Sequence, residues 1–140
     1  MNPTLTDLLL GQAVAIAAPQ PPEAGGDYMA SRLGMIAMIA TMAAQEVERG
    51  PAVRIWENEA IQALLDRSAE AYGPRTIDRA TVEEFTWSGL DRRNADLRRA
   101  LIALHEAAEP RGDLAVQAEI LDLYVAMAEA RRLELPSALD

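Results

Sequence analysis

The chain of 140 residues contains no cysteine and no lysine, and all of its basic residues are arginines. The absence of cysteine excludes disulfides, thiolate metal sites and cysteine nucleophiles, and it favours a reducing compartment. Only 4% of the residues are aromatic. Because strands prefer aromatic and β-branched residues, this composition favours packed helices over sheets.

Positive charge is also scarce, with 13 basic against 22 acidic residues and a net charge of −9. An acidic surface repels phosphate backbones and anionic lipids, so neither a nucleic-acid partner nor a membrane partner is expected. The apolar run from Leu8 to Ala18 has no basic region before it, because the first basic residue is Arg32. This run therefore favours a helix of a bundle over a signal peptide, and we expect a cytoplasmic protein.

The segment from Tyr28 to Arg49 is predicted to be the central helix. Asp27 can accept hydrogen bonds from the N–H groups of its first turn, whereas Gly50 and Pro51 are residues that end helices. Apolar side chains lie on every side of this segment, and a helix that is apolar all round is buried all round. Its uncharged part is about a dozen residues long, too short for a membrane span of roughly 20.

One face of this helix is made of small residues around Gly34 and Ala37. Such a face lets a neighbouring backbone come close. The neighbour is either another helix of the same chain or a second copy, so a homodimer stays open.

Apolar residues at helical spacing predict helices on both sides of the central one. Their expected ranges are 4–18, 51–72, 91–108 with a start at Asp91 or Ser88, and 113–132, with a short helix over 81–85. The core stripe of 91–108 consists of Leu90, Asn94, Leu97, Leu101, Leu104 and Ala108. In 113–132, which Asp113 caps, Val116, Ile120, Leu123 and Met127 face the core, and Leu121 and Tyr124 widen that face.

Short joints place neighbouring helices antiparallel. The predicted fold class is therefore all-α: a single-domain antiparallel bundle of about five helices over residues 1–140, with a central buried helix. Glu57 lies within the apolar side of 51–72. Because a buried charge is costly unless it is paired, we expect Glu57 at the rim of the bundle, paired with an arginine.

The candidate ligand-binding residues are the densest basic group and the only histidine. They are Arg92, Arg93, Arg98, Arg99 and His105. Guanidinium groups match phosphates and carboxylates, and histidine is the ordinary general base near neutral pH. The favoured alternative is a solvent face whose arginines pair with Asp96, with a surface or half-buried imidazole near the acidic end of the helix.

No pattern of catalytic or metal-binding residues is complete. Di-iron bundles need Glu-x-x-His pairs, but position 102, three before the histidine, is Ile. The carboxylate pairs on one helix face lack a second polar pair beside them; they are Asp66 with Glu70, Glu106 with Glu109, and Glu119 with Asp122. A Walker loop, a dinucleotide fingerprint and a nucleophile elbow are absent from the sequence. We therefore expect no catalytic residue, no metal and no cofactor.

Three pieces of the sequence resemble an uncharacterised family of small helical bacterial proteins. The pieces are Pro3 to Val14, Arg32-Leu33 through Glu46-Val47-Glu48-Arg49-Gly50-Pro51, and the leucine-rich helix pair that closes at Pro136. Members are encoded beside acyl-CoA dehydrogenases and kinases resembling aminoglycoside phosphotransferases. The chain departs from the family at Ile36, where Asn is frequent, and at Gln45, where Arg is frequent.

This resemblance implies an accessory protein near acyl-CoA or small-molecule phosphate metabolism, with the dehydrogenase or the kinase as a partner. It implies no catalytic residue, because the family has no established activity. The first functional hypothesis is thus a non-catalytic accessory or protein-interaction module. The second is a protein or enzyme that binds an anionic small molecule through the arginine group and His105.

Overall fold

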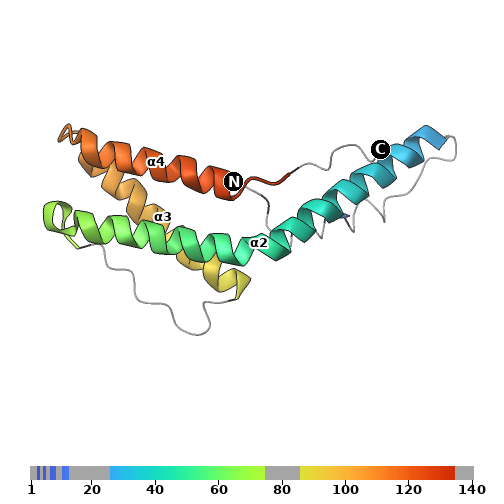
Figure 1. Ribbon diagram of the computed structural model, residues 1–140, viewed down its shortest axis with the longest axis horizontal. Helices are drawn as coiled ribbons and strands as arrows, with labels where there is room; N and C mark the ends of the chain where they lie inside the picture. Colours follow the sequence, from blue (N-terminus) through green and yellow to red (C-terminus); the bar gives the residue numbers. More distant parts are fainter. Residues whose placement is uncertain are drawn as a thin grey trace. The chain divides into compact units, whose positions relative to one another are not determined.

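The computed structural model of the protein describes residues 3, 5, 7, 8, 11, 12, 26–74 and 86–134. The elements in these ranges are the helices α2 (Gly26–Tyr72), α3 (Trp87–Ala108) and α4 (Leu114–Ala130) (Figure 1). The described part of the chain contains no strand, so the prediction of an all-α class is confirmed. Residues 5, 7, 8, 11 and 12 are helical, whereas the rest of 4–18 and the short helix 81–85 lie outside the described residues.

The predicted count of about five helices is not confirmed, because the segments 28–49 and 51–72 form one helix. Helix α2 continues through Pro51. Gly50 does not adopt the left-handed conformation that ends a helix, in contrast to Gly73 and Gly112, whose φ angles are +82° and +63°. Pro51 removes one backbone hydrogen bond, to the carbonyl of Val47. Because Val47 is exposed, water can solvate that carbonyl.

Contacts group the chain into two compact units. The first is Met1–Gly50 with Leu133–Asp140, and the second is Pro51–Arg132. The single domain over residues 1–140 stays a prediction.

In the first unit, the first half of α2 is largely exposed. Met35 and Val47 expose 53% and 55% of their surface, and Met38 is exposed as well. The prediction of a central buried helix is therefore wrong. An apolar helix is buried only where apolar faces of other helices meet it, and the leucine-rich faces of α3 and α4 meet the second half of α2 instead.

Two further features of this unit are the small-residue face at Gly34 and a contact between Gln45 and Glu134. A Cβ atom added at Gly34 would have nothing within 4 Å, so none of the residues that the structure describes makes the close backbone approach predicted at this glycine. Near the boundary, the Gln45 amide donates to the Glu134 carbonyl at 2.7 Å and accepts from the Glu134 N–H at 2.8 Å.

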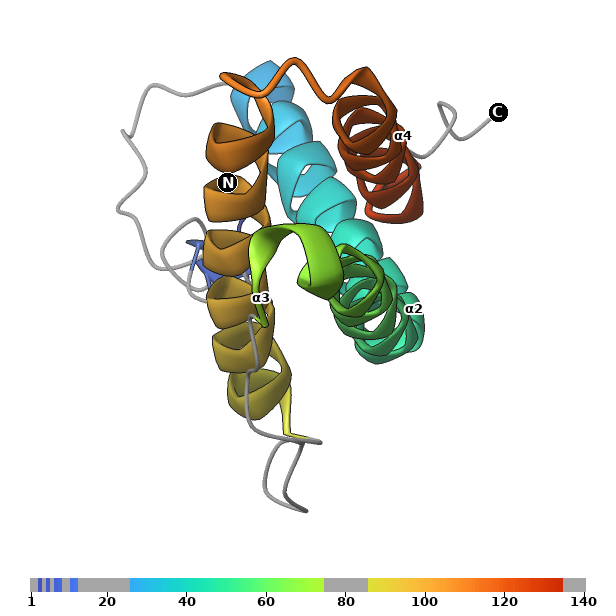
Figure 2. The ribbon, with the colours of Figure 1, turned by 90° about the vertical axis from the view of Figure 1, so that its left-hand side faces the viewer.

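The second unit is a bundle of three helices around one apolar core. The second half of α2, α3 and α4 enclose this core, and Figure 2 shows α3 from the side, at an angle to the other two. The core consists of Ile61, Leu64, Leu65, Leu97, Leu101, Leu104, Ile120 and Met127. Every residue of the predicted stripe of α3 is buried, which confirms that prediction. Of the predicted α4 face, Ile120 and Met127 are buried, and Val116, Leu123 and Tyr124 pack against the core.

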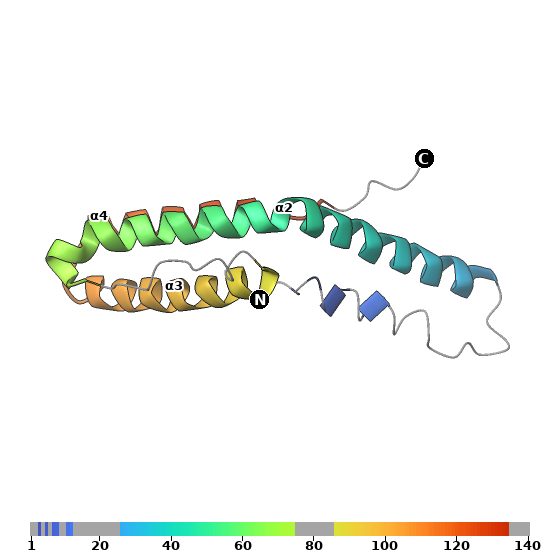
Figure 3. The ribbon, with the colours of Figure 1, turned by 90° about the horizontal axis from the view of Figure 1, so that it is seen from below.

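Neighbouring helices were predicted to be antiparallel, but α2 and α3 are parallel. Asn94 of α3 contacts Glu57 of α2, and Asp91 contacts Arg54, so α2 and α3 run in the same direction and lie side by side (Figure 3). Residues 73–86 join them, and a segment of that length can reach roughly 45 Å, more than the roughly 33 Å of α3. Helix α4 is antiparallel to both, as the contact of Arg131 with Glu57 and Asn94 requires.

Candidate functional site

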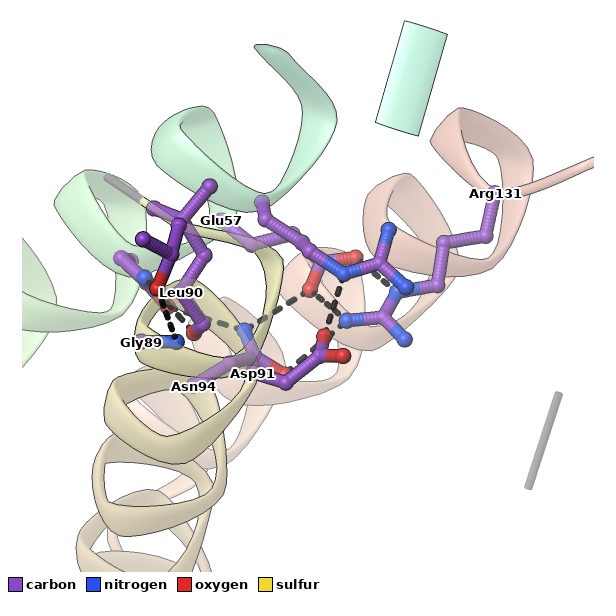
Figure 4. Close-up of polar contacts among 9 residues, drawn as sticks. Glu57, Gly89, Leu90, Asp91, Asn94 and Arg131 are labelled. Atoms are coloured by element: carbon purple, nitrogen blue, oxygen red, sulfur yellow. Dashed lines mark hydrogen bonds and ion pairs between the residues drawn. The ribbon is translucent and has the colours of Figure 1, made fainter. Parts of the chain in front are cut away.

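The most concentrated polar group of the second unit lies around Glu57, whose side chain is 0% exposed. Arg131, which follows the last residue of α4, donates from Nε to Glu57 Oε1 at 2.6 Å and from a terminal nitrogen to Oε2 (Figure 4). The pairing of Glu57 with an arginine was predicted from the sequence and is confirmed. Its position is not at the rim, because this carboxylate is completely enclosed by the bundle.

Asn94 of α3 connects the pair to Asn58, another buried polar residue. Its Nδ2 donates to Glu57 Oε2 at 2.9 Å and to Asn58 Oδ1 at 3.0 Å. Its Oδ1 accepts from Arg131 at 2.9 Å, and Asn58 Nδ2 donates to the carbonyl of Leu90 at 3.4 Å. One connected set of hydrogen bonds thus joins all three helices of the bundle (Figure 4).

A second ion pair extends this group toward the start of α3. Arg54 is buried, and its Nε donates to the carboxylate of Asp91. The guanidinium carbon of Arg54 also lies 4.6 Å from the centroid of the Trp87 ring, a geometry that attracts the cation to the aromatic face. Thr86 accepts from Gly89 N–H and thereby caps α3, which fixes Trp87 and Asp91 on the first turn.

The role of this buried group is structural. A catalytic base must reach a substrate proton within hydrogen-bond distance, but Glu57 is enclosed and engaged by Arg131 and Asn94. A satisfied buried network instead specifies how helices align. We therefore assign the Glu57 network to the register of the three helices and not to chemistry.

The opposite end of the bundle has a smaller polar contact. Tyr72, at the end of α2, donates to Asp113 at 2.8 Å, and Arg111 lies 4.4 Å above the tyrosine ring. Burial and the neighbouring Asp113 raise the pKa of Tyr72. The hydrogen bonds from Tyr72 and from the Val116 N–H lower the pKa of Asp113. Asp113 caps α4, as predicted, so this contact joins two helix ends.

The five predicted ligand-binding residues all lie on α3, but they do not converge. A helix turns about 100° per residue, so Arg92 and Arg99 lie opposite the core, Arg93 lies on one flank, and Arg98 and His105 lie on the other. Arg99 pairs with Asp96 on its own helix, as the salt-bridged alternative predicted. A ligand site formed by all five residues stays a prediction.

Arg98 and His105 share their flank with Tyr124 of α4. The ring centroids of His105 and Tyr124 are 6.3 Å apart. Burial raises the pKa of Tyr124, and the positive charge of Arg98 opposes part of that rise. This side of α3 therefore adjoins α4.

An apolar surface of the bundle that the sequence analysis did not predict is the outer face of α4. Leu114, Leu121 and Val125 expose 75%, 53% and 65% of their surface. They form, together with two exposed alanines, a continuous line that we call the outer stripe: Leu114, Ala118, Leu121, Val125 and Ala128. The placement of Leu121 in the core was wrong. Neighbouring Ile120 is the residue that points inward. The regular spacing of the outer stripe in the sequence could have indicated a second apolar face on this helix.

Metal-binding clusters and membrane-spanning helices are both absent from the ranges that the structure describes. In those ranges, no three His, Cys, Asp or Glu side chains gather closely enough to hold a metal ion. None of the helices there is long and apolar enough to cross a membrane.

Comparisons with known proteins add no relative. No protein-family model, no curated protein and no solved structure matches the chain. The resemblance to the family encoded beside acyl-CoA dehydrogenases and kinases therefore stays a prediction.

Proposed function

We propose that the protein is a non-catalytic accessory protein that acts by binding another protein chain through the outer stripe of α4. The observation that carries this proposal is the pair of apolar faces on one helix. Ile120 and Met127 fill the core, while Leu121 and Val125 on another side are exposed. Single exposed apolar residues are ordinary, but a contiguous line of them is typical of an interaction surface.

The use of polar residues supports the same function. The buried carboxylate and amides of the bundle are engaged with one another or with Arg131, and the arginines of α3 point in different directions. The buried groups hold helices together, whereas the large side chains of the outer stripe are exposed and take no part in that packing. The enzymes and kinases that the family resemblance implies are the first proteins to test as partners.

Capture from native lysate tests the proposal if matched variants are compared. The first variant combines Leu121→Glu with Val125→Glu, which places two charges on the outer stripe. The control is Val47→Glu, because Val47 has nearly the same exposure as Leu121 but lies outside the bundle unit. A protein captured by wild type and by the control, but lost from the stripe variant, supports the function. Equal capture by all three contradicts it.

A further inference from the structure

We propose that the chain binding to the outer stripe is a second copy of this protein, with the two α4 helices packed in parallel and in register. The inference rests on the proposed function, because it uses the same face of α4 and names its occupant. Two properties of that face support it, the spacing of its residues and the charges on its two sides, and its size sets how strong the pair can be.

The spacing is that of a two-stranded coiled coil. Successive residues of the outer stripe are four, three, four and three positions apart, which gives the average of 3.5 that keeps two helices in contact along a seam. Leu114 and Leu121 occupy one type of seam position, and Val125 occupies the other. Leucine at the first type and a β-branched residue at the second favour parallel pairs of two strands.

The two sides of the stripe differ in charge, and one of the acidic residues, Glu129, also contacts Arg132 of its own chain at 3.7 Å. Asp122 and Glu129, which each follow a stripe residue directly, lie on one side and are exposed. On the other side, Tyr124 adjoins His105 and Arg98 of α3. In a parallel pair, each side of one helix faces the opposite side of its partner, so acidic residues meet the side that carries Arg98. An antiparallel pair would bring the two acidic sides together.

The size of the face sets the strength of the dimer. Helix α4 has 17 residues, so it is about 26 Å long, and a strip about 10 Å wide covers roughly 260 Å². Stable dimers bury about 800 Å² per partner. The pair formed through α4 is therefore weak and depends on protein concentration.

Because the chain has no cysteine, single introduced cysteines report how two copies are arranged. We would prepare Leu114→Cys and Ala128→Cys separately and treat each with a short bismaleimide cross-linker over a range of protein concentrations. Salt should be near physiological, since the net charge of −9 repels copies more strongly at low ionic strength. The two positions lie about 21 Å apart along one helix, so the cross-linker joins only positions that face each other.

A parallel pair in register predicts that each variant cross-links to itself as concentration rises. Adding Leu121→Glu with Val125→Glu should abolish this product. Asp122→Arg with Glu129→Arg should weaken dimerisation about two- to fivefold, and adding Arg98→Glu should restore it. Sedimentation of wild type, Leu121→Glu with Val125→Glu, and the charge variants provides the same comparison without a cross-linker.

Several results would overturn the proposal. Cross-links formed only when the two cysteine variants are mixed would indicate an antiparallel pair, and cross-links that survive in the stripe variant would place the contact elsewhere. If wild type stays monomeric while capture of another protein still depends on the outer stripe, the proposal of a second copy is wrong and the proposed function stands. If neither self-association nor capture of another protein depends on the outer stripe, both the dimer and the proposed function are contradicted.

Discussion

Arg131 donates two hydrogen bonds to Glu57, a carboxylate with no exposed surface that lies 74 residues earlier in the chain. The contact joins the end of α4 to a residue near the start of the second half of α2, and Asn94 of α3 contacts both partners. Three helices thus share one charged contact beside the apolar core of the bundle. The alignment of the helices follows from this contact, because none of the three can slide without leaving a buried polar group unpaired.

Removal of either partner should destabilise the bundle strongly. Arg131→Met leaves the Glu57 carboxylate buried without its cation, and a broken buried pair costs about 3–5 kcal/mol. Urea denaturation followed by circular dichroism measures this change. The double variant Glu57→Leu with Arg131→Met should recover much of the loss, since no charge is then buried.

The neighbouring arginine provides the control for this experiment. Arg132 contacts Glu129 at 3.7 Å, and both side chains are largely exposed. Arg132→Met should change the free energy of unfolding by about 0.5 kcal/mol or less. Equal effects of Arg131→Met and Arg132→Met would show that the buried network does not hold the helices in register.

The Tyr72–Asp113 contact should make stability depend on pH in two directions. The pKa of Asp113 is lowered in the folded protein, so its contribution is present above the unfolded pKa and is lost as pH falls through the folded pKa. The pKa of Tyr72 is raised, so its contribution is present below the unfolded pKa and is lost as pH rises through the folded pKa.

Tyr72→Phe isolates this contact. It removes the hydroxyl that donates to Asp113, so the variant should be less stable than wild type at neutral pH. The difference should shrink in acid, where the hydrogen bond from Tyr72 no longer favours an ionised carboxyl group. Urea midpoints of both proteins across the pH range provide the measurement. A difference that stays constant from neutral to strongly acidic pH is the contrary result.

Pro51→Ala tests whether α2 is one helix. In a continuous helix the substitution restores an N–H donor to the Val47 carbonyl and removes a residue that costs up to about 3 kcal/mol relative to alanine. The free energy of unfolding should therefore rise, and the helical circular dichroism signal of the folded protein should not fall. Pro110→Ala, in the turn after α3, is the control and should give no comparable gain. If Pro51 began a separate helix, alanine at this position would bring no stabilisation.

The sequence was sufficient for the parts of the fold that depend on local periodicity. The stripe from Leu90 to Ala108 predicts which side of α3 is buried, and Asp113 predicts where α4 begins; both are confirmed. Spacing alone shows which residues share a face. It does not show how many faces of a helix have a partner, which is why the first half of α2 was wrongly placed at the centre.

The polar network and the outer stripe depend on tertiary arrangement. The sequence predicted that Glu57 pairs with an arginine. Which residues contact it, Arg131 and Asn94, depends on the directions of α2, α3 and α4. Helix α4 is apolar on two faces, and a sequence pattern does not say which of them meets the core. Leu121 was therefore grouped with Ile120, although the structure places them on different sides.

Replacement of these two neighbours is the most direct test of the account, because Ile120 is 0% exposed whereas Leu121 is on the outer stripe. Ile120→Glu buries an unpaired charge and should prevent folding. Leu121→Glu should leave the free energy of unfolding within about 0.5 kcal/mol of wild type, measured by urea denaturation at a concentration where the chain is monomeric. If Leu121→Glu unfolds the protein as Ile120→Glu does, the outer stripe is covered within the chain and is not available to a partner.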